Sequence, residues 1–279
     1  MAAEEIASFL DDVRLARRKL PRADLPLDSM ATHYAELALA ERGTTAITDR
    51  VIVLADLWTL VAAEQLASMA ALIRAGEHVF GLFPLARSVV EHSAAVVWVL
   101  APDLSVEQRC ARAALAIDRS NEELVTASAH LADKSNETYK ARRAAMRELR
   151  EQVVTEFPDY TDLAASPKTI AGETPVSPTA LVRHFAEAAG FNPREWEGIY
   201  DYLCAAANHP TLAAFEFFSE EGQSGHLPTM SEDFLDRLIR AVISPCLMAL
   251  QGYAAYCGWD ASIVADLLAR SAELFPDPT

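Results

Sequence analysis

The chain has 279 residues, of which 51% are hydrophobic, and its 40 acidic and 24 basic side chains give a formal net charge of -16. This apolar content is sufficient for a continuous core. The strong negative charge opposes binding of a phosphate backbone, so no DNA partner is expected. The composition predicts a soluble cytoplasmic protein. No shift in composition marks a boundary, and we predict a single domain over residues 1–279.

The N-terminal third is predicted to be helical. Residues 1–27 carry apolar side chains at helical spacing up to a proline-containing break at 21–26, and we interpret them as an N-terminal packing arm. A second helix is expected over residues 28–42, where a glycine then stops it. A third and longer helix is expected over residues 50–74, preceded by cap residues at 48 and 49.

The stretch Glu77–Ala101 is apolar at nearly every angle of a helical wheel, which is typical of a helix buried in a core. Arg87, Glu91 and His92 interrupt it. An ionised group removed from water requires a partner or a shifted pKa. We therefore expect the rest of the chain to pack around this helix, and we predict a polar site inside the helical core.

A capping-box pattern at residues 105–108 predicts the start of a long helical run that turns polar through residues 132–156. The run includes the only basic cluster of the chain, at residues 140–150. This cluster is typical of a solvated helix face, and the alternative is a contact for an acidic partner or RNA. Residues 157–176, rich in proline, serine and threonine, predict a long surface loop that could cover an entrance.

Several start signals predict helices in the last third of the chain. Ser-Pro at 177–178 and Asn-Pro at 192–193 each place a good N-cap before a proline in the first helical position. A capping box at residues 229–232 and a cap at Asp260 predict two further helices.

The segment Ala241–Trp259 approaches transmembrane length. It contains serine, proline and glutamine and has no flanking basic bias, so we interpret it as a buried core helix and expect no membrane association. No alternating strand pattern is present anywhere. The predicted fold is an all-α bundle of about nine or ten helices around a buried central helix.

Arg87 and Glu91 stand four positions apart on one helical face, and Trp98 extends that face. One interpretation is a buried structural ion pair. The other is a pocket in which Arg87 binds an anionic group while Glu91 orients the ligand or exchanges a proton. His209 precedes a proline at a helix end and is a candidate for the same site.

Many familiar sites are absent from the sequence. It has no P-loop, no Rossmann glycine fingerprint, no nucleophile elbow, and no metal-binding Glu-x-x-His or HExxH pattern. No metal or other cofactor is therefore predicted. The four cysteines lie far apart and are interpreted as buried thiols.

The run LARSVVEHSAAVVWVLAPD, followed by Arg109 and Arg112, resembles an uncharacterised bacterial all-helical family common in actinomycete-like sequences. Members carry an Arg-x-x-x-Glu helix, an Arg-x-x-Arg helix and a tyrosine-rich helix ending in histidine. The last of these is matched by IYDYLCAAANHP, which contains Tyr202 and His209. The resemblance implies that Arg87, Glu91, Arg109, Arg112 and His209 converge. We assign Arg109, Arg112, Trp98 and Tyr202 as candidate ligand-binding residues.

Arg87-Ser-Val-Val-Glu-His92 is similar to the Arg-x4-6-His motif of HEPN-type ribonucleases, which are compact helical bundles that usually dimerise. The resemblance implies that Arg87 polarises a phosphate and that His92 handles the proton of a ribose hydroxyl. RNA is a partner only under this interpretation.

The leading hypothesis is a protein that binds, and could transform, a small polar or anionic metabolite in a buried pocket lined by Arg87, Glu91 and His209. The alternatives are a HEPN-like ribonuclease using Arg87 and His92, and a non-catalytic protein-interaction module. A homodimer is expected, through an apolar face near the C-terminal helices.

Overall fold

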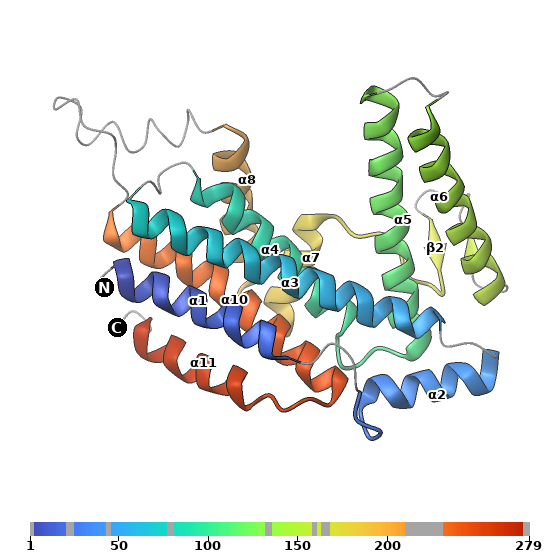
Figure 1. The fold of residues 1–279 in the computed structure, drawn as a ribbon, viewed down its shortest axis with the longest axis horizontal. Coiled ribbons are helices and arrows are strands. Elements are labelled where there is room, and N and C mark those ends of the chain that lie inside the picture. Colours follow the sequence, from blue (N-terminus) through green and yellow to red (C-terminus); the bar gives the residue numbers. More distant parts are fainter. Residues whose placement is uncertain are drawn as a thin grey trace. The chain divides into compact units, whose positions relative to one another are not determined.

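A computed structural model describes most of the chain (Figure 1). The described residues are 3–20, 25–42, 46–76, 81–131, 136–157, 161–162, 168–209 and 231–275. In these ranges the chain forms ten helices and one pair of two-residue strands, which confirms the predicted all-α class. Contacts group the chain into two compact units. The first contains residues 1–32, 55–100 and 177–279, and the second contains 33–54 and 101–176. That both belong to one domain remains a prediction.

The first unit is built around α4 (Leu82–Val99), within the stretch that the sequence marks as a core helix. It packs against α10 (Glu232–Cys257), α7 (Pro178–Ala188) and α8 (Pro193–Asn208). Most of its side chains are buried because its apolar residues occupy all sides of the helix. The predicted start of this helix at residues 77–80 lies outside the described residues.

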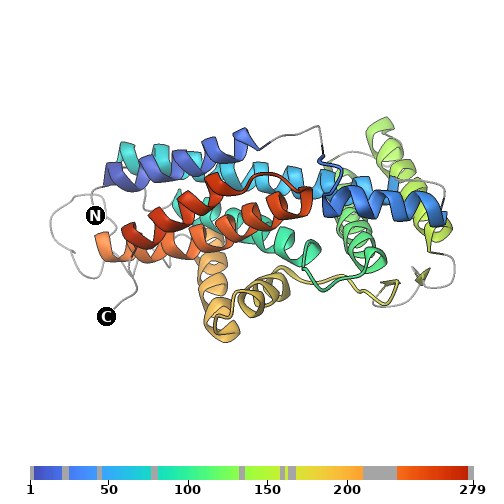
Figure 2. The same ribbon diagram turned by 90° about the horizontal axis from the view of Figure 1, so that it is seen from below.

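Three more helices complete the first unit. α1 (Ala3–Lys19) buries the apolar face that its spacing predicts, and α11 (Ser262–Leu274) lies beside α1 and α10 (Figure 2). α3 (Ala46–Ala75) contributes its residues from Ala55 onward and its earlier residues belong to the second unit. It begins before the predicted caps at 48 and 49, so those two residues are the third and fourth of the helix.

Local capping chemistry sets several helix starts as predicted. The side chain of Ser29 accepts a hydrogen bond from the N–H of Thr32 at 3.0 Å. Ser177 and Asn192 accept in the same way from the first turns of α7 and α8. Asp260 accepts from the N–H of the first residue of α11 at 2.8 Å. These bonds satisfy amides that have no partner inside their own helix.

α10 differs from its prediction at the N-terminus. Its cap is Ser231, which accepts from the N–H of Phe234 at 3.3 Å, whereas the predicted cap at Thr229 lies outside the described residues. Gly258 ends the helix in the left-handed conformation, with φ of 68°. Pro245 lies inside the helix and has no N–H, so the usual hydrogen bond to the carbonyl of Ala241 cannot form.

The second unit contains α2 (Met30–Arg42) from residue 33 onward, α5 (Val106–Leu131) and α6 (Glu137–Glu156). α5 and α6 pack side by side (Figure 1). The sequence predicted one long run through residue 156. The structure instead starts a new helix at α6, because the side chain of Asn136 accepts from the N–H of Thr138 at 2.8 Å and caps it.

The segment 157–176 is not simply the surface loop that its composition predicts. β1 (Thr161–Asp162) pairs antiparallel with β2 (Thr169–Ile170), and Ile170 and Phe157 are buried. Two-residue strands are too short to produce an alternating pattern, which is why the sequence predicted no strand. The covering role of this segment stays a prediction, and residues 158–160 and 163–167 lie outside the described ones.

Two described helices are long and apolar enough to cross a membrane by length and composition: residues Thr48–Ala75 of α3, and α10. The apolar window of α10 is 67% buried, as expected of a core helix, and that of α3 is 33% buried. Such helices are weak evidence for a membrane span, and the predicted absence of membrane association is untested.

Candidate functional site

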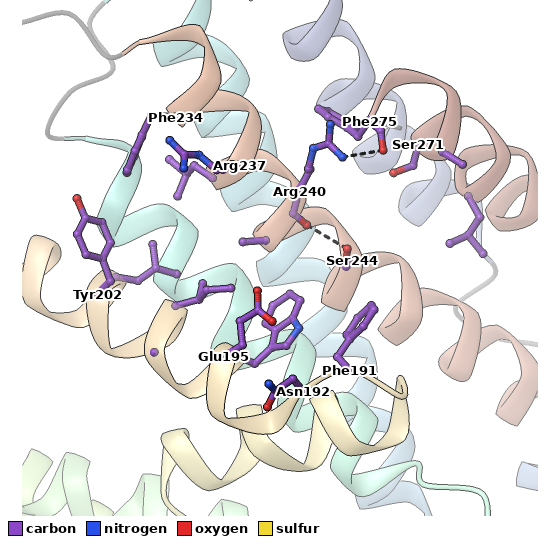
Figure 3. Close-up of a pocket in the computed structure, with 18 residues that line it drawn as sticks. Phe191, Asn192, Glu195, Tyr202, Phe234, Arg237, Arg240, Ser244, Ser271 and Phe275 are labelled. Carbon is purple, nitrogen blue, oxygen red and sulfur yellow. Dashed lines mark hydrogen bonds between the residues drawn. The ribbon is translucent and has the colours of Figure 1, made fainter. Parts of the chain in front are cut away.

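A groove of about 870 Å³ opens in the first unit between α8, α10 and α11 (Figure 3). Most of its lining is apolar or aromatic, with a few charged and hydroxyl groups. The lining residues are Phe191, Asn192, Glu195, Trp196, Gly198, Ile199, Tyr202, Leu203, Phe234, Arg237, Leu238, Arg240, Ala241, Ser244, Leu268, Ser271, Ala272 and Phe275. Tyr202 is a predicted ligand-binding residue that lies here, whereas Arg87, Glu91 and His209 do not line this groove.

Aromatic contacts stiffen the α8 side of the groove. The rings of Phe191 and Trp196 are stacked with centroids 5.5 Å apart, and Phe185 packs edge-on against Trp196 at 4.8 Å. Further along α8, Tyr202 packs against Phe234 of α10 at 6.0 Å. Such pairs add to the stability that burial alone provides. The groove therefore has aromatic side chains that are held in place before any ligand arrives.

The charged groups of the groove come mainly from α10 and α8. Arg240 donates to the backbone carbonyl of Phe275 at 2.9 Å and lies over its ring, so this guanidinium is already engaged. Arg237 is exposed and donates from Nε to the carbonyl of Asp233 at 3.3 Å. Among the described residues no carboxylate pairs with Arg237. Glu195, on the α8 wall, likewise has no ion-pair partner within the described part of the chain.

Gly198 opens the α8 wall. A Cβ atom built at this position meets no atom within 4 Å. Glycine in the interior of a helix destabilises it by about 0.5–1 kcal/mol relative to alanine. Its presence therefore leaves space in the groove at the expense of helix stability.

The predicted pair of Arg87 and Glu91 forms, with Nε 2.7 Å from a carboxylate oxygen. The same oxygen accepts from the hydroxyl of Tyr200, and Arg87 also reaches the side-chain oxygen of Asn208 at 3.4 Å. The two charged side chains are 31% and 26% exposed, so the pair is half-buried, which corrects the prediction of a buried pair. Two polar residues four apart can meet at the edge of a core, because only one side of a helix need be covered.

This cluster shifts the proton affinity of two of its members. The hydrogen bond from Arg87 to Glu91 raises the pKa of Arg87 above its usual value. Burial raises the pKa of Tyr200, and the hydrogen bond to Glu91 adds to this effect. Both residues therefore keep their protons at neutral pH. The cluster joins α4 to α8 and so supports the helix that carries one wall of the groove.

The two candidate histidines lie apart from the groove. His209 is the exposed C-cap of α8, and its backbone N–H bonds to the carbonyl of Ala205 at 2.8 Å. His92 lies with Nδ1 2.7 Å from the backbone carbonyl of Ser88, one turn earlier on its own helix. The HEPN-like role of Arg87 and His92 stays a prediction.

Arg109 and Arg112 belong to the second unit. Arg109 is buried, donates to the carbonyl of Ala101 at 2.7 Å and lies over the ring of Tyr34 at 5.0 Å. Arg112 pairs with Glu173 at 2.8 Å. These contacts lie within one unit, and the convergence of both arginines with Arg87 remains a prediction.

Other expected positions differ in the structure. Trp98 is buried in α4 rather than lining the groove. Asp56 and Glu64 of α3 pair with Arg17 and Arg18 of α1, the second pair at 2.8 Å, and not with Arg87. Three cysteines are buried as predicted, whereas Cys204 is half-buried.

Sequence reasoning missed the charged residues of the groove. A signal was present, because Phe234, Arg237, Ala241 and Ser244 recur at helical spacing and share one face of α10. An arginine among apolar and small residues on one helix face indicates a position that is neither in the hydrophobic core nor on a fully solvated surface. What the pattern lacked was any indication that α8 and α11 lie opposite this face.

Within the described part of the chain, no group of three or more histidine, cysteine or acidic side chains could hold a metal ion. No protein-family model, curated protein or solved structure matches the chain. Function is therefore inferred from the groove itself.

Proposed function

We propose that the protein binds a small amphipathic metabolite in the groove between α8, α10 and α11. The apolar part of the ligand lies among the aromatic side chains, and an anionic group of the ligand binds Arg237. The single observation that carries the proposal is a guanidinium with no described carboxylate partner on the wall of an aromatic groove.

The size of the groove supports a small molecule. Its volume of about 870 Å³ falls within the range of about 300–1,000 Å³ that is usual for ligand pockets. Its composition is also usual for such pockets, which are mainly apolar and carry a few polar groups that orient the ligand.

The state of Arg237 favours an anion. A guanidinium offers a planar fork of donors that matches a carboxylate, and here only Nε is bonded to a described group. The protein carries a formal charge of -16, so an anionic ligand needs a local cation such as Arg237 to bind here. A carboxylate at this position would form charge-assisted hydrogen bonds beside the apolar walls of the groove.

Native mass spectrometry of the untagged full-length protein tests the proposal. We expect a discrete mass increment from a co-purified small molecule. Gly198→Leu places a side chain in the open space of the groove and should remove the increment. Gly252→Leu is the matched control, because Gly252 lies in α10, has the same empty surroundings and does not line the groove.

Arg237→Met is expected to reduce the fraction of liganded protein while leaving the thermal midpoint of the apo-protein unchanged, since the side chain is exposed. A wild-type protein without an increment, whose thermal midpoint also does not rise with indole-3-propanoate, L-tryptophan or tryptamine, would contradict the proposal. So would an increment that survives Gly198→Leu.

A further inference from the structure

Two opposite charges face the same groove without neutralising each other. Figure 3 shows Glu195 on the α8 wall and Arg237 on the α10 wall, and no ion pair joins them. Two neighbouring acids do have cationic partners, since Glu197 pairs with Arg183 and Asp236 approaches Arg240 at 3.9 Å. Among the described residues, the groove thus keeps one carboxylate and one guanidinium available.

The hydrogen-bond ladder of α10 is interrupted beside the groove. Pro245 has no N–H, so the carbonyl of Ala241, a groove residue, does not receive its usual helical hydrogen bond. The adjacent Ser244 donates its hydroxyl to the carbonyl of Arg240 at 3.0 Å, one position earlier than Ala241. A donor on a ligand would find in this groove an anionic acceptor, Glu195, on α8.

We infer that the ligand is zwitterionic, an α-amino acid or a close derivative with a large apolar side chain; this inference rests on the proposed function. Its carboxylate binds Arg237, its ammonium group binds Glu195, and its side chain lies among the aromatic residues. A plain anion would satisfy Arg237 but would leave Glu195 to repel it in the same groove. A ligand with both charges satisfies both walls.

Isothermal titration calorimetry with three matched probes tests this inference on the full-length protein. L-tryptophan carries both charged groups, indole-3-propanoate lacks the ammonium group, and tryptamine lacks the carboxylate. We expect L-tryptophan to bind about tenfold or more tightly than either of the others, since each loses a hydrogen bond to a charged group.

Single substitutions test which residue binds each charged group of the ligand. Glu195→Gln should reduce the affinity for L-tryptophan to that for indole-3-propanoate, and Arg237→Met should reduce it to that for tryptamine. Asp201→Asn, on the exposed side of α8, and Arg194→Met, in its first turn, are the charge-matched controls, because neither residue lines the groove. Both controls are expected to leave the affinities unchanged.

The outcomes separate the two proposals. Equal affinity for L-tryptophan and indole-3-propanoate, abolished by Gly198→Leu, would overturn the zwitterion and leave the proposed function in place. Tighter binding of tryptamine than of L-tryptophan would likewise overturn it, by assigning the groove to cations. Failure of all three probes to bind would reject the zwitterion, and would reject the proposed function as well if native mass spectrometry also showed no increment.

Discussion

Tyr200 of α8 donates its hydroxyl hydrogen bond to Glu91 of α4, on the oxygen that also contacts Arg87. Tyr200→Phe removes this donor and keeps the ring. We expect the free energy of unfolding to fall by about 1 kcal/mol. Urea denaturation followed by circular dichroism measures it. Tyr139→Phe is the control, because no hydrogen bond of its hydroxyl is described, and equal losses in both variants would contradict the assignment.

The phenol of Tyr200 also predicts how the stability of the protein changes at alkaline pH. Burial raises the pKa of Tyr200 and also that of Tyr253 above the ordinary value of about 10. The contribution of these two phenols to stability is fully present below about pH 10, and it is lost as pH rises through their folded-state pKa values. In an ultraviolet titration we expect late ionisation of these two phenols among the described tyrosines. Tyr200→Phe should remove one late step, and an unchanged titration curve would refute the prediction.

Asp118 in the second unit predicts the opposite pH dependence. Burial raises its pKa, but hydrogen bonds from Arg150 and Lys168 outweigh burial, so the pKa lies below its usual value. Its contribution to stability is therefore present above the unfolded pKa of about 3.9 and is lost as pH falls through the folded pKa. Asp118→Asn should lower the free energy of unfolding at pH 7 by about 1–3 kcal/mol, and by less in strong acid.

Chemical denaturation of the Asp118 variant at pH 7 and in strong acid measures this difference. Glu123→Gln is a suitable control, because Glu123 forms an exposed pair with Arg119. Such pairs contribute about 0–1 kcal/mol. A loss that is the same at both pH values would show that Asp118 acts through its shape rather than its charge.

Gly258 ends α10 with φ of 68°, and a Cβ atom there would lie 2.7 Å from the Cβ of Ser29. Gly258→Ala therefore adds a clash to the strain of a left-handed residue. Gly76 has φ of 71° with nothing within 4 Å of its added Cβ, so Gly76→Ala reports the strain alone. We expect the free energy of unfolding to fall by about 1 kcal/mol in Gly76→Ala and by clearly more in Gly258→Ala. Thermal melts of both variants measure the two losses of stability, and equal losses would exclude the clash.

Arg17 is fully buried and bonds to Thr59 at 2.7 Å and to the backbone carbonyl of Asp56 at 3.0 Å. Tyr253 bonds to the same aspartate side chain at 3.1 Å. Arg17→Met leaves the Asp56 carboxylate without its cationic partner, and we expect a loss of about 3 kcal/mol in the free energy of unfolding. Arg18→Met, at an exposed neighbouring position, should change it by under about 1 kcal/mol. Similar losses in the two variants would contradict a special role for Arg17.

The helices themselves follow from short-range chemistry. Ser177 and Asn192 cap α7 and α8 as their positions before proline predict, and the apolar residues around α4 place it in the core. The pairing of Arg87 with Glu91 also follows from spacing, since residues four apart on a helix are neighbours. Each of these features depends on residues within a few positions of one another.

What the sequence by itself determined is therefore the all-α class, most helix starts and the identity of the central helix. Only the tertiary structure decided that Glu91 bonds to Tyr200, 109 positions away, and that Arg237 shares a groove with Glu195. The groove combines three helices that are separate in the chain. Periodicity shows which face of each helix is apolar, but the choice of neighbour depends on how all the faces pack together, and no local pattern encodes that choice.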